Sequence, residues 1–426
     1  MTLSPAAGRT RLTSNQIRGF WAAWAGFTLD GMDSFIYSLV LVPAMTELLP
    51  SSGIEATPGN IGFYGSVLFS LFLIGWGLSM IWGPIADRFG RVKTLMLTIL
   101  CYSVFTFLCA FVSNVWLLAV FRLLAGIGIG GEWSMGSTFV AEEWPEDRRK
   151  MGAGYMHTGY YFGVFLAAIA NYIVGVRYGW RAMFLLGGTP ALLVGFIQYG
   201  VSESRTWQRG EHKKMGAAFA KIFSGTYARR TWLNSLFVFV SIIGLWAGSV
   251  YVPASVTQMA MRQGYTAADA ARLASYGTML LSAGTILGCV VLPAIAESFG
   301  RRVTLGMFFA LMFLTISIGF GYIFYQANAL LAFMTILFFL GVGGANFAMY
   351  TLWLPEQYAT DCRASAFAFA TSVGRFGGAG ITFLVGAGVQ YFQTLGTPVA
   401  LTSIAFLIGL AALPFGEETR GKPLPR

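Results

Sequence analysis

Twelve apolar stretches, each about 20 residues long, limit what this chain can fold into. A stretch of that length and polarity is what an α-helix needs to cross the hydrocarbon core of a bilayer. Only 11% of the 426 residues are charged, whereas soluble domains carry about a quarter. The sequence therefore predicts an all-α polytopic membrane protein, with spans at about 20–48, 62–86, 94–113, 115–140, 151–175, 181–201, 232–259, 272–296, 304–325, 328–354, 364–392 and 397–415.

The distribution of Lys and Arg predicts the orientation of these spans. Most of the 28 basic residues fall in the two tails and in every second connecting segment. The other connecting segments hold only four: Arg177, Arg181, Arg262 and Arg272. Cytoplasmic loops are enriched in Lys and Arg, so both termini are expected on the cytoplasmic side of the cell (inner) membrane. The net charge of +10 then reflects topology, and nucleic-acid binding is not indicated.

A polar interval divides the chain into two similar halves. IADRFGR at 85–91 recurs as IAESFGR at 295–301, and VPA at 42–44 recurs at 252–254. Internal repeats are common in secondary transporters, and here they predict two pseudo-symmetric six-helix bundles. The expected organisation is a cytoplasmic N-tail (1–19), an N-terminal bundle (20–201), a cytoplasmic central loop (202–230), a C-terminal bundle (231–415) and a cytoplasmic C-tail (416–426).

Charged residues stand at equivalent cytoplasmic loops of the two halves. They are expected to pair and to latch the two bundles in one state, while ordinary positive-inside loops with turn glycines are the alternative. The charged candidates are Asp87, Arg88, Arg91, Glu142, Arg149, Glu297, Arg301, Glu356 and Arg363, and the glycines that accompany them are Gly83 and Gly90.

Several of these segments resemble the major facilitator superfamily over the full length of the chain. The matching stretches are GPIADRFGRVK (83–93), RLLAGIGIGGEW (122–133), VSESRTW (201–207) and EETRGKPL (417–424). GGEW…FVAEEWPEDRR (130–149) together with DGMD (30–33) resembles the sialate:proton symporters and their lactate-transporting relatives, and DG-x-D is shared with aromatic-acid:proton symporters. The resemblance implies the major facilitator fold, transport by alternating access and a monomer. The Gly-Pro pair of proton antiporters is missing from 151–175, which favours symport or uniport over drug/proton exchange.

Two aspartates interrupt the first apolar stretch. An ionised carboxylate at mid-bilayer depth costs roughly 2.5–3.5 kcal/mol. Asp30 and Asp33 are therefore expected to have a function that offsets this cost. Their spacing places them on one helix face, expected to point toward a central cavity, and two carboxyls that close do not both ionise easily in a low dielectric. They are therefore the expected proton site, with Arg122 as counter-charge and Glu132 as a second proton site or gate. A permanent structural pairing with Arg122, and a hydrogen-bonded buried carboxyl at Glu132, are the alternatives.

Arg375 in the eleventh stretch has no carboxylate neighbour in its own half of the sequence. We expect it to bind the carboxylate of a substrate in a bidentate fork, although pairing with Asp30 or Asp33 across the bundles is an alternative. The other expected substrate contacts are Tyr161, His157, Asn346, Asn234 and Tyr350. His157 is also a candidate proton relay, with a merely hydrogen-bonded histidine as its alternative, and packing or a place in the interface belt is the alternative for Asn346, Asn234 and Tyr350.

These residues favour a secondary active transporter that carries a small organic anion by proton symport. The anion is expected to be a monocarboxylate, an aromatic acid or a sialic-acid-like compound. A uniporter or a sugar-like neutral-solute porter, in which the aspartates are structural, is the alternative. The sequence shows no nucleophile–base constellation and no zinc-ligand spacing, so an enzyme, a metal site and a cofactor are not expected. The partners are then the anion, protons as coupling ions and the lipid bilayer.

Overall fold

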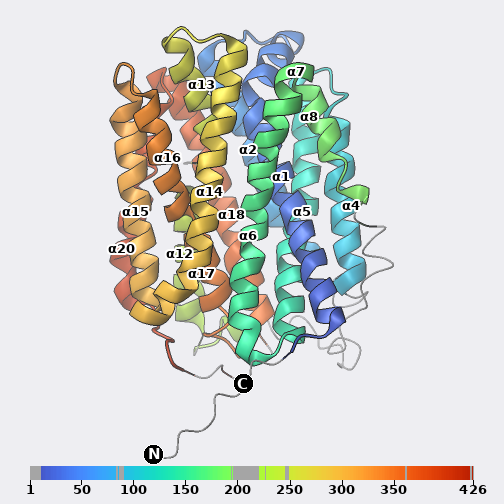
Figure 1. The fold of residues 1–426 in the computed structure, drawn as a ribbon, viewed down its shortest axis with the longest axis vertical. Helices are drawn as coiled ribbons and strands as arrows, with labels where there is room; N and C mark the ends of the chain where they lie inside the picture. Colours follow the sequence, from blue (N-terminus) through green and yellow to red (C-terminus); the bar gives the residue numbers. More distant parts are fainter. Residues whose placement is uncertain are drawn as a thin grey trace, which may run out of the picture.

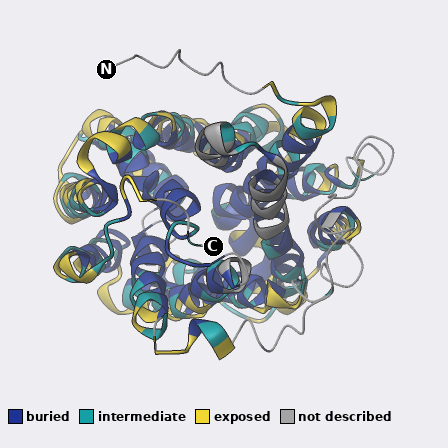
Figure 2. Ribbon diagram, turned by 90° about the horizontal axis from the view of Figure 1, so that it is seen from below, coloured by how far each residue is buried: buried dark blue, intermediate teal, exposed yellow. Residues whose placement is uncertain are grey.

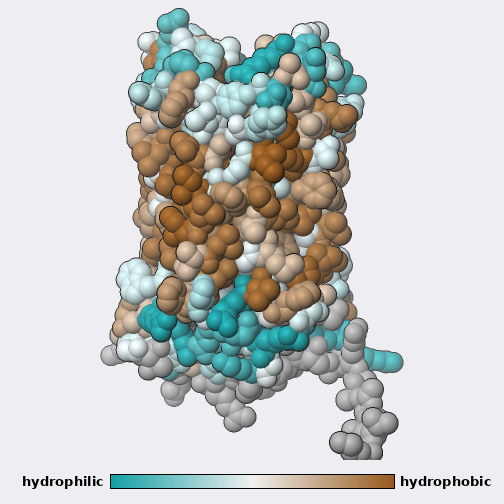
Figure 3. Space-filling view, turned by 90° about the vertical axis from the view of Figure 1, so that its left-hand side faces the viewer, coloured by the Kyte–Doolittle hydropathy of each residue, from teal (hydrophilic) through white to brown (hydrophobic). Residues whose placement is uncertain are grey.

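The helices of this chain run side by side along one axis and form an elongated bundle (Figure 1). The computed structural model describes residues 11–82, 85, 91–192, 194, 220–225, 227–244, 249–359, 362–422 and 425. Within this described part the regular elements are helices and helical turns, and no strand is present. Ten of the helical segments are long and apolar enough to cross a membrane. Figure 3 shows the matching surface, a broad hydrophobic band between two hydrophilic ends.

The N-terminal half begins with a long capped helix. The Thr13 side chain accepts a hydrogen bond from the backbone N–H of Gln16, and the Gln16 side chain accepts one from the backbone N–H of Thr13. This capping box sets the start of α1. The side chains of Thr57 and Asn114 each accept one backbone N–H at the starts of α2 and α5. The elements are α1 (Ser14–Ser51), α2 (Pro58–Leu78), η1 (Ser79–Ile81), α4 (Arg91–Cys109), α5 (Val115–Glu143), α6 (Glu146–Ala170), the π-helical η2 (Asn171–Gly175), α7 (Val176–Tyr178) and α8 (Trp180–Gly187).

The C-terminal half contains the remaining helices, and Thr266 caps the longest of them. The elements are α12 (Ala228–Ile242), α13 (Val252–Arg262), α14 (Ala267–Phe299), α15 (Arg301–Gly321), η4 (Ile323–Tyr325), α16 (Leu330–Gly344), α17 (Asn346–Trp353), α18 (Arg363–Phe392), α19 (Gly396–Leu401), α20 (Ile404–Ala412) and η5 (Leu413–Phe415).

Two of the twelve expected spans are not among the ten membrane-length helical segments of the described residues. In the span expected at 181–201, α8 ends at Gly187 and the chain turns through 188–190, where glycine and proline disfavour a helix; most of the rest lies outside the described residues. The span expected at 232–259 is divided into α12 and α13, and residues 245–248 between them are not described. Pro253, in the first turn of α13, has no N–H to donate and therefore suits a helix start better than a helix interior.

The two halves pack as two groups of helices that meet along two seams. One seam joins α2 to α18, and the other joins α6 to α14, which lie side by side in Figure 1. The described chain begins and ends at the same end of the molecule, the lower end in Figure 1. Seen from that end in Figure 2, buried residues face the inside and exposed residues face outward. Apolar side chains such as Phe111, Leu331 and Leu384 are exposed on the outside, as expected for a lipid-facing surface.

Within the N-terminal group α1 and α6 approach each other very closely. A Cβ atom on Gly31 would lie 2.0 Å from the backbone oxygen of Tyr160, and one on Gly163 would lie in contact with the backbone oxygen of Thr28. Small residues allow such contacts between helices in lipid. This crossing places the middle of α1, with its two aspartates, deep inside the molecule.

Candidate functional site

Five ionisable side chains predicted to be functional are buried together near the middle of the molecule. Each is at most 4% exposed, and they come from three helices of both groups: Asp30 and Asp33 on α1, Arg122 and Glu132 on α5, and Arg375 on α18. Buried charges are costly unless they are paired, and ionisable residues inside a membrane protein mark functional sites by default.

Asp33 points into the N-terminal group of helices. Its Oδ2 atom lies 4.0 Å from Nη1 of Arg122, and Thr106 of α4 and Gly187 of α8 are its other neighbours. The Arg122 guanidinium stacks over the ring of Phe72, 4.2 Å from its centroid. Neither the oxygens of Asp33 nor the three side-chain nitrogens of Arg122 have a hydrogen-bond partner among the described residues. This ion pair is therefore long and poorly satisfied, and it is suited to break and re-form.

Asp30 faces a different set of groups from Asp33. Its Oδ1 accepts a long hydrogen bond from Ser34 at 3.4 Å, and Oδ2 has no hydrogen-bond partner among the described residues. The opposite charge that acts on it is Arg375, from the other group of helices, although the two do not come within ion-pair distance. Glu132 and Asp33 are its like-charged neighbours. The two aspartates thus face one arginine each, Asp33 within the N-terminal group and Asp30 across to the C-terminal group.

Arg375 keeps part of its guanidinium free. Nη1 donates a hydrogen bond of 2.9 Å to the backbone oxygen of Thr371, one turn earlier in α18. The group lies over two indole rings, 4.2 Å from the centroid of Trp76 and 5.4 Å from that of Trp133. Nε is buried and has no hydrogen-bond partner among the described residues. Nε and Nη2 form one edge of the guanidinium, and such an edge binds a carboxylate with two parallel hydrogen bonds.

Glu132 lies on the side of Asp30 that leads toward the chain termini. A Cβ atom on Gly26 of α1 would be 3.2 Å from Oε2 of Glu132, and Gly26 precedes Asp30 by one helical turn. Tyr102 of α4 is its polar neighbour. The carboxylate is 2% exposed, and neither oxygen has a hydrogen-bond partner in the described structure. Because the Tyr102 hydroxyl stands next to this carboxylate, a proton site or gate and a hydrogen-bonded structural carboxyl both stay predictions for Glu132.

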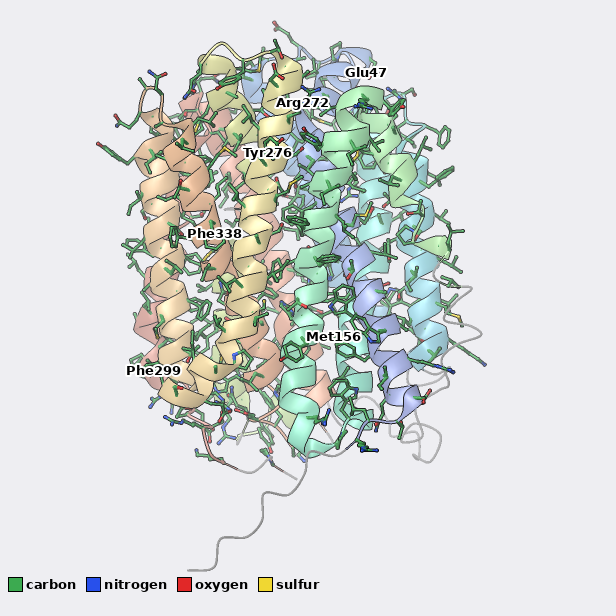
Figure 4. All side chains as sticks on the ribbon, viewed as in Figure 1. Glu47, Met156, Arg272, Tyr276, Phe299 and Phe338 are labelled. Atoms are coloured by element: carbon green, nitrogen blue, oxygen red, sulfur yellow. The ribbon has the colours of Figure 1, made fainter. Side chains whose placement is uncertain are left out.

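Aromatic side chains from both groups close the molecule between Arg375 and the end that holds the termini. His157 of α6 follows Met156, which Figure 4 labels in the lower half, and its ring is nearly parallel to Phe347 of α17 at 6.2 Å. Trp133 contacts Phe347 at 5.6 Å and Phe367 of α18 at 4.9 Å. These contacts join α5 and α6 to α17 and α18 across the molecule.

The opposite end is closed by hydrogen bonds between the two groups. Asn171 of η2 donates to Ser275 of α14 at 3.0 Å. One residue further along each element, the hydroxyls of Tyr276 and Tyr172 are 3.2 Å apart, near the upper end where Figure 4 labels Tyr276. Ser66 and Tyr251 are joined by a hydrogen bond as well.

Between the two closed ends lies a very small cavity. Its volume of about 10 Å³ has room for one water molecule at most. It is lined by Phe35, Tyr161, Val164, Ser249, Leu281, Ser282, Thr285, Leu340, Gly341 and Gly344, which come from both groups of helices. The described side chains around this cavity therefore leave no room for a substrate.

The other predicted substrate contacts divide into two sets. Tyr161 lies at the junction of the groups, because its hydroxyl donates to the backbone oxygen of Gly344 at 3.3 Å. Asn346 donates through Nδ2 to the backbone oxygen of Gly343 at 2.8 Å, within the C-terminal group. Tyr350 and Asn234 are engaged within the C-terminal group. Tyr350 donates to the backbone oxygen of Phe237, and Asn234 donates to Gln357 and Tyr358. The geometry gives Tyr350 and Asn234 a role in joining α12 to α17 and the residues after it.

Three predicted latch residues, Glu297, Arg301 and Glu356, lie in contact, and Arg301 is fully buried. Its guanidinium pairs with Glu356 at 2.8 Å and with Glu297 at 2.7 Å. The pairs connect helices of the C-terminal group, rather than one group with the other. Gly83, Asp87, Arg88 and Gly90 lie outside the described residues, and the side chains of Arg91, Glu142, Arg149 and Arg363 are not described.

Sequence reasoning missed two sets of residues in these sites. One is the aromatic set around Arg375, Trp76 above all, because in a chain with 16% aromatic residues no single ring stands out. The other is the C-tail, where Thr419 donates to Glu356 and Glu417 pairs with Arg230. The quoted stretch EETRGKPL was the signal for this second set, but it indicated a likeness and not a contact.

Comparison with known proteins places this geometry in context. The family model described as Major Facilitator Superfamily matches residues 23–382. A probable 4-methylmuconolactone transporter of Cupriavidus pinatubonensis is 29% identical over 95% of this chain and 91% of its own length. The niacin transporter NiaP of Acinetobacter baylyi is 27% identical over 95% of this chain and 94% of its own length. The sialic acid transporter NanX of Escherichia coli is 31% identical over 49% of each chain.

The fold is also similar to solved structures. A crystal structure of a D-xylose–proton symporter has a TM-score of 0.71 at 18% identity and covers 96% of this chain and 100% of that one. The structure of the xylose transporter XylE of Escherichia coli, in a partially occluded inward-open conformation, has a TM-score of 0.72 at 19% identity. It covers 97% of this chain and 100% of that one. At this level of identity the likeness concerns the fold alone.

Proposed function

The chain belongs to the Major Facilitator Superfamily, and we propose that it transports a small organic anion together with protons by alternating access. As the sequence predicted, it is a multi-pass membrane protein with the major facilitator fold, and its family and relatives are transporters rather than enzymes. The observation that carries the proposal is the buried Nε atom of Arg375, which has no hydrogen-bond partner among the described residues. A substrate carboxylate supplies the partner that this atom lacks.

The surroundings of Arg375 support an anion as the substrate. The relatives are named for niacin, sialic acid and a methylmuconolactone, and the first two compounds are carboxylic acids. Arg375 belongs to the C-terminal group of helices, whereas the titratable carboxyls belong to the N-terminal group. An anion bound to Arg375 therefore lies at the junction of the two groups, where alternating access requires the substrate to bind.

Coupling follows from the way that Asp30 and Arg375 face each other across this junction. When Asp30 is ionised it attracts Arg375 and repels an incoming carboxylate. When a proton neutralises Asp30, the guanidinium is released to bind the substrate. Asp33 and Arg122 form a second pair that a proton opens in the same manner. Glu132 takes the proton onward toward the end that holds the termini.

We also propose the placement of the chain in the cell membrane. The end at which the described chain begins and ends faces the cytoplasm, because most Lys and Arg residues are predicted on that side. Residues 20–201 and 231–415 form the two moving bundles, which the packing into two groups with two seams supports. The working unit is a monomer, because the site is assembled within one chain.

Proton movement into proteoliposomes tests this function. A trapped pH dye reports acidification when benzoate, lactate, sialic acid or a neutral sugar is added outside. We expect one acid to drive proton uptake above the level of protein-free liposomes, and Asp33→Asn and Arg375→Ala to abolish it. Arg272→Gln, at the far end of α14 (Figure 4), is the control that keeps uptake. Downhill flux of a neutral sugar without proton movement for any acid would instead establish the uniporter alternative.

A further inference from the structure

From the surroundings of Arg375 we infer that the substrate is a planar, conjugated monocarboxylate, and that the indole ring of Trp76 selects it. This inference rests on the proposed function, since it assumes that Arg375 binds the carboxylate. It narrows the substrate from organic anions in general to ring acids whose carboxylate lies in the plane of the ring.

The plane of the Arg375 guanidinium is held from two directions. Its face rests on the Trp76 ring at 4.2 Å, and its Nη1 is bound to the backbone oxygen of Thr371. The group therefore has little freedom to tilt. A carboxylate that binds the Nε–Nη2 edge with two parallel hydrogen bonds lies in the plane of the guanidinium. The position and the plane of the bound carboxylate are both set before the substrate arrives.

A conjugated acid extends this plane, and a saturated acid does not. In a conjugated ring acid the carboxylate and the ring share one plane, so the ring continues the surface that the guanidinium begins. Trp76 and Trp133 both lie within 5.4 Å of the guanidinium centre, so this surface borders on aromatic faces. Stacked aromatic rings gain about 0.5–1.5 kcal/mol beyond the burial of their area. A puckered saturated ring does not obtain this contribution.

The shell beyond the arginine consists largely of aromatic side chains. Trp133 contacts the rings of Phe27, His157, Phe347 and Phe367, which come from α1, α6, α17 and α18. The Tyr161 hydroxyl and the Asn346 amide both donate to backbone oxygens. This leaves Nε1 of Trp133 and Nδ1 of His157 as polar atoms of the aromatic shell without a partner among the described residues. A polyhydroxylated acid needs many partners, and its unpaired hydroxyl groups carry a desolvation cost. This shell therefore disfavours sugar acids.

The charges around the site favour a single carboxylate. Arg375 is the cation that acts on Asp30, while Asp30 has two carboxylate neighbours, Glu132 and Asp33. A second negative charge on the substrate would face these carboxyls without a cation of its own. The geometry, the shell and the charges thus point to the same class of substrate.

Binding of matched ligands to the purified full-length protein in detergent tests this inference. Isothermal titration compares benzoate with cyclohexanecarboxylate, which has the same number of carbon atoms but a puckered ring. Benzamide, which is planar and neutral, and N-acetylneuraminate, which is polyhydroxylated, complete the set. We expect benzoate to bind about three- to tenfold more tightly than cyclohexanecarboxylate, and the other two to bind far more weakly than either.

Substitutions at Trp76 identify the origin of this preference. Trp76→Leu removes the aromatic face, and we expect the ratio of the two dissociation constants to fall close to one. Trp76→Phe keeps a ring and part of the preference. Phe324→Leu is the matched control, because Arg262 lies over Phe324 at 4.9 Å outside the site, and it leaves the ratio unchanged. Gel filtration and melting temperature show that each variant is folded.

The outcomes separate the inference from the function on which it rests. Equal binding of benzoate and cyclohexanecarboxylate, or a preference that persists in Trp76→Leu, overturns the inference. If both acids then still lose affinity in Arg375→Lys, the anion anchor stands and only the planar class is wrong. If no acid binds to the wild type and none drives proton uptake, the proposed function itself fails.

Discussion

Gly31 shows how strictly a single residue is constrained next to the charged site. A Cβ atom there would lie 2.0 Å from the Tyr160 backbone oxygen, and a backbone oxygen cannot move aside cheaply. We expect Gly31→Ala to destabilise the protein by about 1–3 kcal/mol and to lower its melting temperature in detergent. Gly380→Ala is the control, because no atom lies within 4 Å of its added Cβ. Alanine favours a helix by about 1 kcal/mol over glycine, so Gly380→Ala keeps or raises the melting temperature. Equal melting of the two variants would contradict the close α1–α6 crossing.

Glu132 provides a second prediction at the scale of the residue. If it carries the proton away from Asp30, Glu132→Gln removes net proton-coupled uptake, because the proton has no onward acceptor. Exchange of labelled for unlabelled acid needs no proton release and is retained at close to the wild-type rate. Counterflow and net uptake in the same proteoliposomes measure the two activities. Glu55→Gln, an exposed glutamate outside the site, leaves both unchanged. Loss of exchange together with net uptake would show that Glu132 is needed for substrate binding or for folding instead.

The charged residues of the site could be recognised from the sequence, but their partners could not. An aspartate or an arginine within an apolar stretch is a rare and costly event, so Asp30, Asp33, Arg122 and Arg375 stood out at once. The spacing of the two aspartates placed them on one face of a helix. It could not show that a difference in direction of about 60° gives each of them a different arginine, because the sequence does not tell which of the neighbouring helices each side of α1 packs against.

At the scale of the helix, length and hydropathy predicted ten spans that the structure contains. The span expected at 232–259 contains α12, which ends at Ile242, and α13, which begins at Val252, and residues 245–248 between them are not described. Hydropathy averages over a window and does not register a single Pro253 or Gly244. The division of the α16–α17 stretch at Ala345 was missed for the same reason. Such breaks depend on local backbone geometry, which becomes visible only in three dimensions.

The start of α15 depends on a residue far away in the sequence. Gly300 at the N-cap has no side chain, and the Glu418 carboxylate accepts from the backbone N–H groups of Arg301 at 3.0 Å and Arg302 at 3.2 Å. Removing a helix cap costs about 1 kcal/mol. We therefore expect Glu418→Gln to lower the melting temperature near neutral pH. Glu55→Gln again serves as the control. Unchanged melting of Glu418→Gln would mean that the C-tail is not docked on α15.

The same contact predicts a pH dependence. Burial raises the pKa of the Glu418 carboxyl, but the backbone N–H groups that it accepts from outweigh this effect and hold the pKa below its usual range. A depressed pKa means that the stabilising contribution is complete above the unfolded value of about 4.3 and is lost as the pH falls through the folded pKa. The difference in melting temperature between wild type and Glu418→Gln should therefore shrink once the pH falls below the unfolded value, and vanish below the folded pKa. A difference that stays constant down to pH 3 would contradict the role of the ionised carboxylate.

For the whole molecule, the decisive feature is that contacts between the two groups close both ends at once. Alternating access requires these contacts to break in turn, so a covalent link at one end should stop the cycle. Asn171 and Ser275 are hydrogen-bonded at 3.0 Å across the groups. In a background without the four native cysteines, we expect Asn171→Cys/Ser275→Cys, joined by a short bifunctional methanethiosulfonate, to lose uptake in proteoliposomes and to regain it on reduction. Ser317→Cys/Ser403→Cys has the same spacing of 3.0 Å within the C-terminal group, and linking it should leave uptake intact. Transport that continues through a complete Asn171–Ser275 link would mean that this end does not open during the cycle, and that the two groups do not move apart there as rigid bundles.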